Sequence, residues 1–286
     1  MSRVEIVEVG PRDGLQNEAR LSSPEEKVAL ITACAAAGLP AIELGAFVSP
    51  KWVPQMADTD AVLSACPDLP GVRGSVLIPN LKGLEALMQA EGRARVQEVA
   101  VFVAASEGFS RANLNADIAT TVARAHEVRL AAQEAGYRVR AYISCVTDCP
   151  FEGPTDPDAV ARVAAALAGA DTLSLGDTIG KGSPERVTQM ARAVLREWEA
   201  PRVAGHFHDT SGQAIDNVAA CLELGITTFD ASVAGLGGCP YAPGAPGNLA
   251  TEALVHFLHA RGLETGVDEV ALGRAVGLAR GMREAA

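Results

Sequence analysis

Short apolar runs alternate along the chain with longer amphipathic stretches rich in Ala, Leu, Glu and Arg. The short runs have the length and composition of buried parallel strands, and the longer stretches have the period of helices. The pattern predicts strands at 4–9, 41–46, 72–77, 97–103, 138–146, 171–176, 202–208 and 227–233. Eight strands that alternate with helices over 286 residues indicate an α/β protein, a single (β/α)8 TIM barrel.

Local signals support the helices of this pattern. Ser23, Pro24 and two following glutamates place a cap, a proline and acidic side chains at a helix start, and Gly38 stops the same helix. Helices are predicted at 24–37, 56–65, 81–90, 116–135, 157–168, 184–199, 213–223 and 249–261, with an extra C-terminal helix at about 267–284.

The whole chain, residues 1–286, is expected to form one catalytic domain, because no linker, repeat or low-complexity segment divides it. The alternative is an open, doubly wound sheet. No G-x-G-x-x-G motif follows the first strand, which argues against a dinucleotide-binding fold of that kind.

Residue types that carry chemistry follow or end several of the predicted strands. In a barrel, the C-terminal ends of all strands converge on one rim, and active sites lie there. The residues expected at this rim are Arg12 and Asp13 after the first strand, Glu43 on the second, His206 and His208 at the end of the seventh, and Cys239 and Asn248 after the eighth.

His206 and His208 are candidate metal ligands. Alternation along a strand points both imidazoles the same way, into the mouth of the barrel. With Asp13 and the side-chain carbonyl of Asn248 they would form a mixed nitrogen and oxygen set. Without thiolate ligands, such a set favours the divalent cations Mg²⁺ or Mn²⁺ over structural zinc. The alternative is that both histidines are hydrogen-bonded strand residues without a metal.

The bulk composition excludes several classes of function. The net charge of −11, with no run of Lys and Arg, argues against nucleic acid as a partner. No apolar run reaches the roughly 20 residues of a membrane span. The six cysteines form no regular framework and no signal peptide is recognisable, so reduced thiols and a cytoplasmic location are expected. Cys145 and Cys149 lack further partners at zinc-binding spacing.

The sequence resembles the 3-hydroxy-3-methylglutaryl-coenzyme A (HMG-CoA) lyase family over nearly its whole length. The resemblance is carried by E-V-G-P-R-D-G-L-Q-N-E (8–18), F-V-S-P-K-W-V-P-Q-M-A-D (47–58), S-L-G-D-T-I-G (174–180), H-F-H-D-T (206–210) and G-L-G-G-C-P-Y-A-P-G-A-P-G-N-L-A-T-E (235–252). It implies cleavage of HMG-CoA to acetyl-CoA and acetoacetate, as in leucine degradation and ketone body formation. It also implies an acyl-CoA as the substrate, and we expect a homodimer or higher homo-oligomer.

The resemblance also implies roles for single residues. The residues that match the family's divalent-cation ligands are Asp13, His206, His208 and Asn248. Arg12 matches the arginine that contacts substrate, and Cys239 matches the catalytic cysteine.

The chemistry of carbon–carbon cleavage suits these residues. A cation chelated by the 3-hydroxyl and a carboxylate oxygen of the substrate would acidify that hydroxyl. Asp13, His206 and Glu43 are all candidates for the base that takes its proton. Arg12 can stabilise the enolate of the acetyl-CoA fragment. Cys239, protonated at neutral pH and preceded by two glycines that allow loop closure, is suited to protonate the enolate carbon.

Three acidic residues near the rim have open roles. Glu252 shares a helix face with Asn248 and is expected either to orient it or to be a surface acid. Asp177 ends the sixth strand, with a structural or a catalytic role. Asp209 is expected to cap the helix that follows it.

Two departures from the family bear on acyl-group preference, because Ala46 and Ser211 replace a usual Ser and Tyr near the expected pocket. One alternative is therefore a lyase for a related, larger 3-hydroxyacyl-CoA. Another is a Claisen-condensing synthase of the isopropylmalate or homocitrate type. Such synthases usually carry Glu-Arg in the last loop, where this chain has Cys239 and Pro240. A third is a barrel that only binds or scaffolds, without catalysis.

Overall fold

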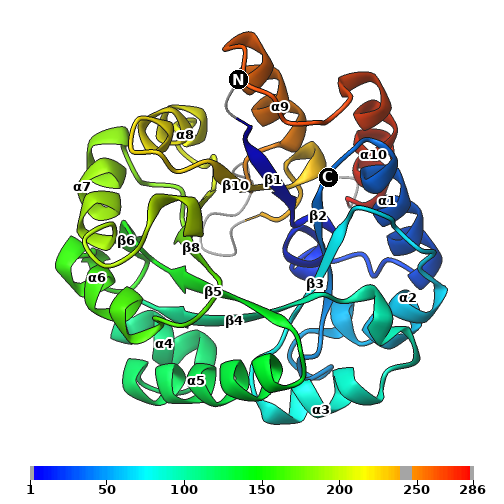
Figure 1. Ribbon diagram of the computed structural model, residues 1–286, viewed down its shortest axis with the longest axis horizontal. Helices are drawn as coiled ribbons and strands as arrows, with labels where there is room; N and C mark the ends of the chain where they lie inside the picture. Colours follow the sequence, from blue (N-terminus) through cyan, green and yellow to red (C-terminus); the bar gives the residue numbers. More distant parts are fainter. Residues whose placement is uncertain (1–2, 239–246, 284–286) are drawn as a thin grey trace.

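The architecture is a closed barrel of parallel strands inside a ring of helices (Figure 1). The structure is a computed structural model that describes residues 3–238 and 247–283. Around the barrel the strands follow the order β1, β10, β9, β8, β5, β4, β3, β2. Their bounds are β1 Glu5–Glu8, β2 Ala41–Ala46, β3 Arg73–Leu77, β4 Glu98–Ala104, β5 Arg138–Ser144, β8 Thr172–Asp177, β9 Val203–Phe207 and β10 Thr228–Ala231.

The barrel closes where β1 pairs with β10. Glu5 of β1 pairs with Thr228 of β10, and Val7 of β1 pairs with Ala41 of β2. The predicted fold class and all eight predicted strands are therefore confirmed, with ends that shift by one or two residues. This closure brings the segment after β1 next to the segment after β10.

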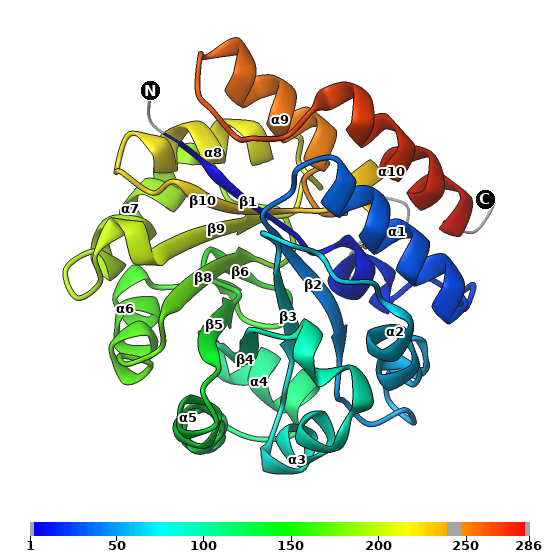
Figure 2. The same cartoon turned by 45° about the vertical axis from the view of Figure 1, so that its right-hand side comes forward.

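The helices form the outer ring, in which α10 packs beside α1 (Figures 1 and 2). Their bounds are α1 Pro24–Ala36, α2 Thr59–Ala65, α3 Leu81–Gln89, α4 Glu107–Leu114, α5 Ile118–Glu134, α6 Pro157–Ala166, α7 Pro184–Val194, α8 Ala214–Leu222, α9 Thr251–Ala260 and α10 Glu269–Met282. No helix in the described ranges is long and apolar enough to cross a membrane.

The start of α1 shows how local sequence sets these elements. Ser23 accepts a hydrogen bond from the backbone N–H of Glu26, whose carboxylate accepts one from the N–H of Ser23. This is the reciprocal cap that the sequence predicted in part. Gly38 follows with φ +90°, a conformation that glycine adopts without strain.

Three features were not predicted. Helix α4 lies between β4 and α5, where no element was predicted. A small antiparallel hairpin, β6 Asp148–Cys149 with β7 Gly153–Pro154, follows β5. A π-helical turn over Gly10–Gly14 follows β1. All three lie directly after barrel strands, where irregular backbone is governed by tertiary contacts rather than by a repeating pattern.

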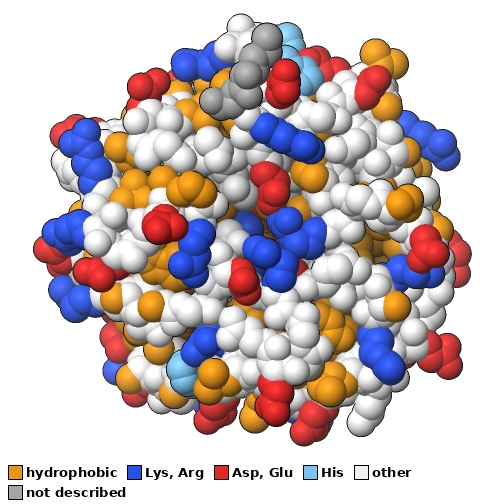
Figure 3. Space-filling view, viewed as in Figure 1, with side chains coloured by type: hydrophobic (Ala, Val, Ile, Leu, Met, Phe, Trp, Pro, Cys, Tyr) orange, Lys and Arg blue, Asp and Glu red, His pale blue; other side chains and the backbone are white. Residues whose placement is uncertain are grey.

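The barrel interior is charged, unlike the apolar layer between strands and helices. Arg140 of β5 and Asp230 of β10 are fully buried and form an ion pair at 2.5 Å. Strands β8 and β9 separate β5 from β10 in the sheet, so this bond crosses the interior. At the N-terminal end, Arg73 pairs with Glu5 at 2.5 Å. Figure 3 shows Lys and Arg gathered at the centre of one face, among scattered acidic side chains.

Candidate metal centre and active site

The turn after β1 places Arg12 and Asp13 on the C-terminal rim of the barrel. The carbonyl of Val9 accepts hydrogen bonds from the N–H groups of Arg12 and Gly14, which tightens the turn. A Cβ at Gly14 would lie 2.7 Å from Oγ of Ser232, so only glycine lets this turn pack against the segment after β10.

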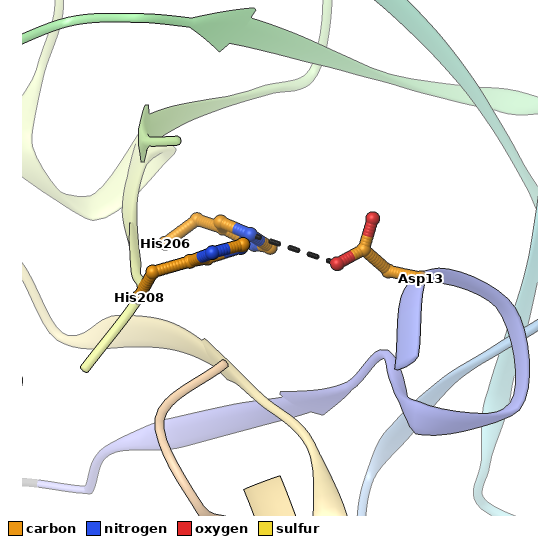
Figure 4. A group of neighbouring side chains, drawn as sticks. All are labelled: Asp13, His206 and His208. Atoms are coloured by element: carbon orange, nitrogen blue, oxygen red, sulfur yellow. Dashed lines mark ion pairs between the residues drawn. The ribbon is translucent and has the colours of Figure 1, made fainter. Parts of the chain in front are cut away.

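Asp13, His206 and His208 converge on one point. Figure 4 shows both imidazoles projecting from the end of β9 toward the Asp13 carboxylate. One potential ligand atom from each residue lies within 4.8 Å of the others. Nε2 of His206 is 3.9 Å from Oδ2 of Asp13. The predicted convergence of these three side chains is therefore present, although 193 residues separate Asp13 from His206 in the chain.

Asn248 lies in the segment after β10 and contacts Asp13 of this group. Its Nδ2 donates to Oδ2 of Asp13 at 2.9 Å and to the carbonyl of Leu236 at 3.1 Å. An isolated antiparallel bridge holds its backbone against His208. Because Nδ2 makes these bonds, the amide oxygen remains as the group that can bind a cation.

Arg12 lies in the wall of the site and is 6% exposed. Its Nε donates to Glu43 at 2.6 Å, and its Nη1 donates to Asp13 at 2.8 Å and to Gln16 at 3.3 Å. Burial opposes the charge of Arg12, but the carboxylates of Glu43 and Asp13 outweigh it and raise the pKa of the guanidinium. Arg12 is thus a fixed, permanently charged group beside the three candidate ligands.

The electrostatics favour cation-binding forms of two ligands. Burial lowers the pKa of His208 to about 4, with a further contribution from His206, so its imidazole is neutral at pH 7. For Asp13, burial raises the pKa, but the charge of Arg12 outweighs it and holds the pKa below its usual range. A neutral imidazole and an ionised carboxylate are the states that bind divalent cations.

The imidazole of His206 also contacts a buried carboxylate, that of Asp230. Its Nδ1 lies 3.2 Å from Oδ2 of Asp230. Burial lowers the pKa of His206, but the hydrogen bond to Asp230 and the charge of Asp13 outweigh it and raise the pKa. Asp230 also accepts from Ser174 at 2.7 Å and from Arg140 at 2.5 Å.

Sequence reasoning missed Asp230, Arg140 and Tyr142. Tyr142 packs edge-on against His206, with ring centroids 6.2 Å apart, and lies beneath Arg12, 5.9 Å from its Cζ. A signal was present: Arg138, Arg140 and Tyr142 alternate with apolar residues along β5, as inward-facing residues do.

These side chains line a cavity of about 210 Å³ at the mouth of the barrel. Its walls include Arg12, Asp13, Tyr142, His206 and His208. A second cavity of about 650 Å³ shares part of this wall, including Gln16, Asn17, Leu77, Phe102 and Asn113. The site therefore offers a small chamber, lined by both polar and apolar side chains, next to a larger space.

Glu43 and Cys239 are the two predicted catalytic residues besides Arg12. Glu43 is fully buried and does not line the cavity, so among the described residues it reaches the site through Arg12. Cys239 lies outside the described residues. Its neighbours Gly237 and Gly238 are described, and both line the cavity.

The remaining residues singled out in the sequence have structural contacts. Glu252 accepts from the N–H of Ala234 at 3.0 Å, and none of its described hydrogen bonds is to Asn248. Asp177 accepts from Thr147 at 2.6 Å and from the backbone that follows β8. Asp209 accepts from the first N–H of α8 at 3.0 Å, so it supplies a bond to the helix start as predicted, although Gln213 occupies the N-cap position.

The two departures from the family pattern lie outside the wall of the small cavity. Ala46 is buried at the end of β2, where its backbone bonds to the Thr59 hydroxyl. Ser211 donates to the carbonyl of Gly180 at 2.5 Å.

The described cysteines are all buried: Cys34, Cys66, Cys145, Cys149 and Cys221. Cys34, Cys66 and Cys221 belong to the apolar layer, as expected for structural residues. Cys145 and Cys149 pack with Ala104 and Phe109. Within the described ranges, the cluster with metal-ligand spacing contains no cysteine.

Comparison with known proteins agrees with this geometry. The model of the HMGL-like family matches residues 3–277. Hydroxymethylglutaryl-CoA lyase of Pseudomonas mevalonii is 53% identical over 270 residues, covering 94% of this chain and 88% of that protein. The 3-hydroxy-3-isohexenylglutaryl-CoA/hydroxymethylglutaryl-CoA lyase of Pseudomonas aeruginosa is 50% identical over 272 residues, covering 94% and 89%. The crystal structure of the HMG-CoA lyase from Brucella melitensis superposes with a TM-score of 0.96 at 49% identity, covering 99% of both chains.

Proposed function

The chain belongs to the HMGL-like family, and we propose from this premise that it is a lyase that cleaves HMG-CoA to acetyl-CoA and acetoacetate. The observation that carries the proposal is the convergence of Asp13, His206 and His208 beside the buried Arg12. The named relatives are lyases, which favours cleavage over the condensing synthase considered above. A scaffold would not need this convergence.

The donor set fits a divalent cation. Two imidazoles, one carboxylate and one amide oxygen are available from Asp13, His206, His208 and Asn248. Nδ1 of His208 is a buried nitrogen without a hydrogen-bond partner among the described residues. Mg²⁺ or Mn²⁺ suits this set of oxygen and nitrogen donors. A bound cation would acidify the substrate's 3-hydroxyl and fix its orientation.

Arg12 stabilises the charge that develops when the bond between C2 and C3 breaks. Cleavage leaves an enolate on the thioester carbonyl of the acetyl-CoA fragment. Glu43 and Asp13 hold the guanidinium at the cavity wall, so no reorganisation is needed as the charge forms. Glu43 positions Arg12 in this account.

Two protons move during the reaction. The proton of the 3-hydroxyl leaves first, and Asp13 and His206 are the candidate bases that line the cavity, with Glu43 behind Arg12. The enolate carbon then receives a proton, which we assign to the thiol of Cys239. The position of Gly237 and Gly238 in the cavity wall supports this assignment, because they directly precede Cys239.

The proposal extends to the whole protein. We take residues 1–286 as one catalytic domain that binds an acyl-CoA ester and assembles as a homodimer or higher homo-oligomer. A cytoplasmic location is part of the same proposal.

A steady-state assay with several 3-hydroxyacyl-CoA esters tests the function. HMG-CoA and 3-hydroxy-3-isohexenylglutaryl-CoA are compared with and without Mg²⁺ or Mn²⁺, and both products are identified. We expect HMG-CoA to be the better substrate and the cation to be required. The His208→Ala variant is the matched control, with lost activity and a retained fold. Condensation of acetyl-CoA with an oxo acid, or no turnover of either ester, would contradict the proposal.

A further inference from the structure

We propose that Asp230 sets the tautomer of His206, so that Nε2 of His206 carries the lone pair that binds the cation. Asp230 is a positioning residue in this account, because it acts through His206. The inference rests on the proposed function in one respect: it takes His206 as a metal ligand.

Three strands deliver hydrogen-bond donors to the Asp230 carboxylate. Arg140 of β5 donates to Oδ1 at 2.5 Å. Ser174 of β8 donates to Oδ2 at 2.7 Å, and Nδ1 of His206 on β9 lies 3.2 Å from the same oxygen. Asp230 is 2% exposed and Arg140 is fully buried. The arrangement is therefore closed on the side away from the cavity.

This geometry determines which nitrogen of His206 carries hydrogen. A carboxylate paired with a buried guanidinium only accepts hydrogen bonds. Nδ1 of His206 must therefore donate to Asp230, and a neutral imidazole has only one N–H. Nε2 then presents its lone pair toward Asp13, 3.9 Å away. A carboxylate that orients a ligating histidine in this way also raises its basicity.

The second histidine of the pair is held differently. Nδ1 of His208 is buried and has no hydrogen-bond partner among the described residues. The backbone bridge to Asn248 fixes the position of His208, but no described carboxylate selects its tautomer. Control by Asp230 is thus specific to His206.

The isosteric variant Asp230→Asn keeps the shape of the side chain, removes its charge and replaces one acceptor oxygen by an NH₂ donor. Arg140 can only donate, so it holds the amide oxygen at the position of Oδ1. The amide NH₂ then faces Ser174, which can accept, and Nδ1 of His206. Nδ1 can accept only in the tautomer that carries its hydrogen on Nε2. The variant therefore places a hydrogen on the nitrogen that must bind the cation.

Two measurements on the metal-free full-length protein test this. ¹⁵N NMR of the imidazoles at about pH 9, above the ordinary titration range of histidine, reports the tautomer. A His206→Asn variant assigns the signals. Calorimetric titration with Mn²⁺ reports affinity. The native protein should carry the His206 hydrogen on Nδ1. Asp230→Asn should carry it on Nε2 and bind Mn²⁺ about 10- to 100-fold more weakly.

Two further variants distinguish tautomer control from a loss of structure. Ser174→Ala removes a bond to the same oxygen but leaves the ion pair, so tautomer and affinity should stay native. In the double variant Arg140→Met/Asp230→Asn, nothing fixes the amide, which can turn its oxygen toward His206. Mn²⁺ affinity should then exceed that of Asp230→Asn alone, whereas a purely structural role predicts a further loss.

The proposal is overturned if native His206 carries its hydrogen on Nε2, a result that needs no variant to fold. It is also overturned if Asp230→Asn keeps the native tautomer and affinity, or if the double variant binds no better than the single one. None of these readouts uses turnover. A protein that shows the expected tautomers but does not cleave HMG-CoA would contradict the proposed function alone.

Discussion

Nδ2 of Asn248 donates to Oδ2 of Asp13 across 2.9 Å, although 235 residues separate the two in the chain. The closure of β10 onto β1 makes this contact, and it joins the two ends of the candidate ligand set. The bond also has a direction. An amide hydrogen, rather than a second negative charge, faces the Asp13 carboxylate before a cation binds.

The first prediction follows from this direction. In Asn248→Asp two carboxylates face each other, so the metal-free variant should lose about 1–3 kcal/mol of stability at neutral pH. Saturating Mn²⁺ should raise the unfolding temperature of this variant more than that of the native protein. Differential scanning calorimetry with and without Mn²⁺ measures both effects. Equal shifts in the two proteins would show that residue 248 does not face the cation.

The second prediction concerns Arg12. Arg12→Gln removes the charge that stabilises the enolate, so kcat for HMG-CoA should fall by about 10²-fold or more, while KM changes much less. Glu43→Gln keeps the guanidinium but weakens its anchor at Nε, so it should reduce kcat by a smaller factor. An effect of Arg12→Gln that is confined to KM would assign Arg12 to ground-state binding.

The third prediction concerns Glu8, a carboxyl buried beneath the rim. It accepts from the N–H groups of Gly10 at 2.8 Å and Val233 at 3.0 Å and from the Thr251 hydroxyl at 2.6 Å. Burial outweighs these bonds and raises its pKa from 4.5 to about 7. The folded state therefore holds a proton that the unfolded state has released between these two pH values.

The sign of the pH dependence follows from this. The stabilising contribution of protonated Glu8 is complete below about pH 4.5 and is lost as pH rises toward about 7, by up to about 3 kcal/mol. Glu8→Gln can keep all three bonds, because the Thr251 hydroxyl can accept from the amide. Chemical denaturation of the metal-free protein should show a smaller loss of stability with rising pH in the variant than in the native chain. The exposed Glu127→Gln on α5 is the control, and an unchanged slope for Glu8→Gln would contradict the prediction.

The fourth prediction concerns Cys239. The five described cysteines are buried, so an alkylating reagent should inactivate the enzyme through Cys239. Cys239→Ser offers a far weaker acid, and turnover should fall steeply while Mn²⁺ affinity stays near normal. Mass spectrometry of the inactivated protein identifies the modified thiol. Native turnover by Cys239→Ser would mean that the proton comes from another group.

The strands and the ligand triad could be predicted because each depends on a local pattern. Alternation along β9 points His206 and His208 the same way, and barrel topology puts both on the rim with Asp13. The ion pair of Arg140 and Asp230, which holds His206 of this triad in place, could not be predicted. Whether Arg140 pairs with Asp230 depends on which strands face each other across the barrel, and neither residue is near the other in the chain.

Rules that use only neighbouring residues predicted the start of α1 but not the turn after β1. The cap of α1 follows from Ser23 and its neighbours, because the residues that make it are adjacent in sequence. The turn over Gly10–Gly14 follows instead from contacts with Ser232 and Leu236, which only the closed barrel brings near. For Glu252, helix spacing left two roles open, orienting Asn248 or a surface acid, and could not show that its carboxylate accepts from the N–H of Ala234.

Product analysis with metal-free and metal-reloaded protein tests most directly whether this chain cleaves HMG-CoA with the help of a divalent cation. Chelator-treated enzyme is incubated with HMG-CoA, then supplied with Mg²⁺ or Mn²⁺, and acetyl-CoA and acetoacetate are quantified throughout. We expect no cleavage without the cation and, after its addition, one acetyl-CoA and one acetoacetate for each HMG-CoA consumed. Full activity in the chelated protein, or products other than this pair, would contradict this expectation.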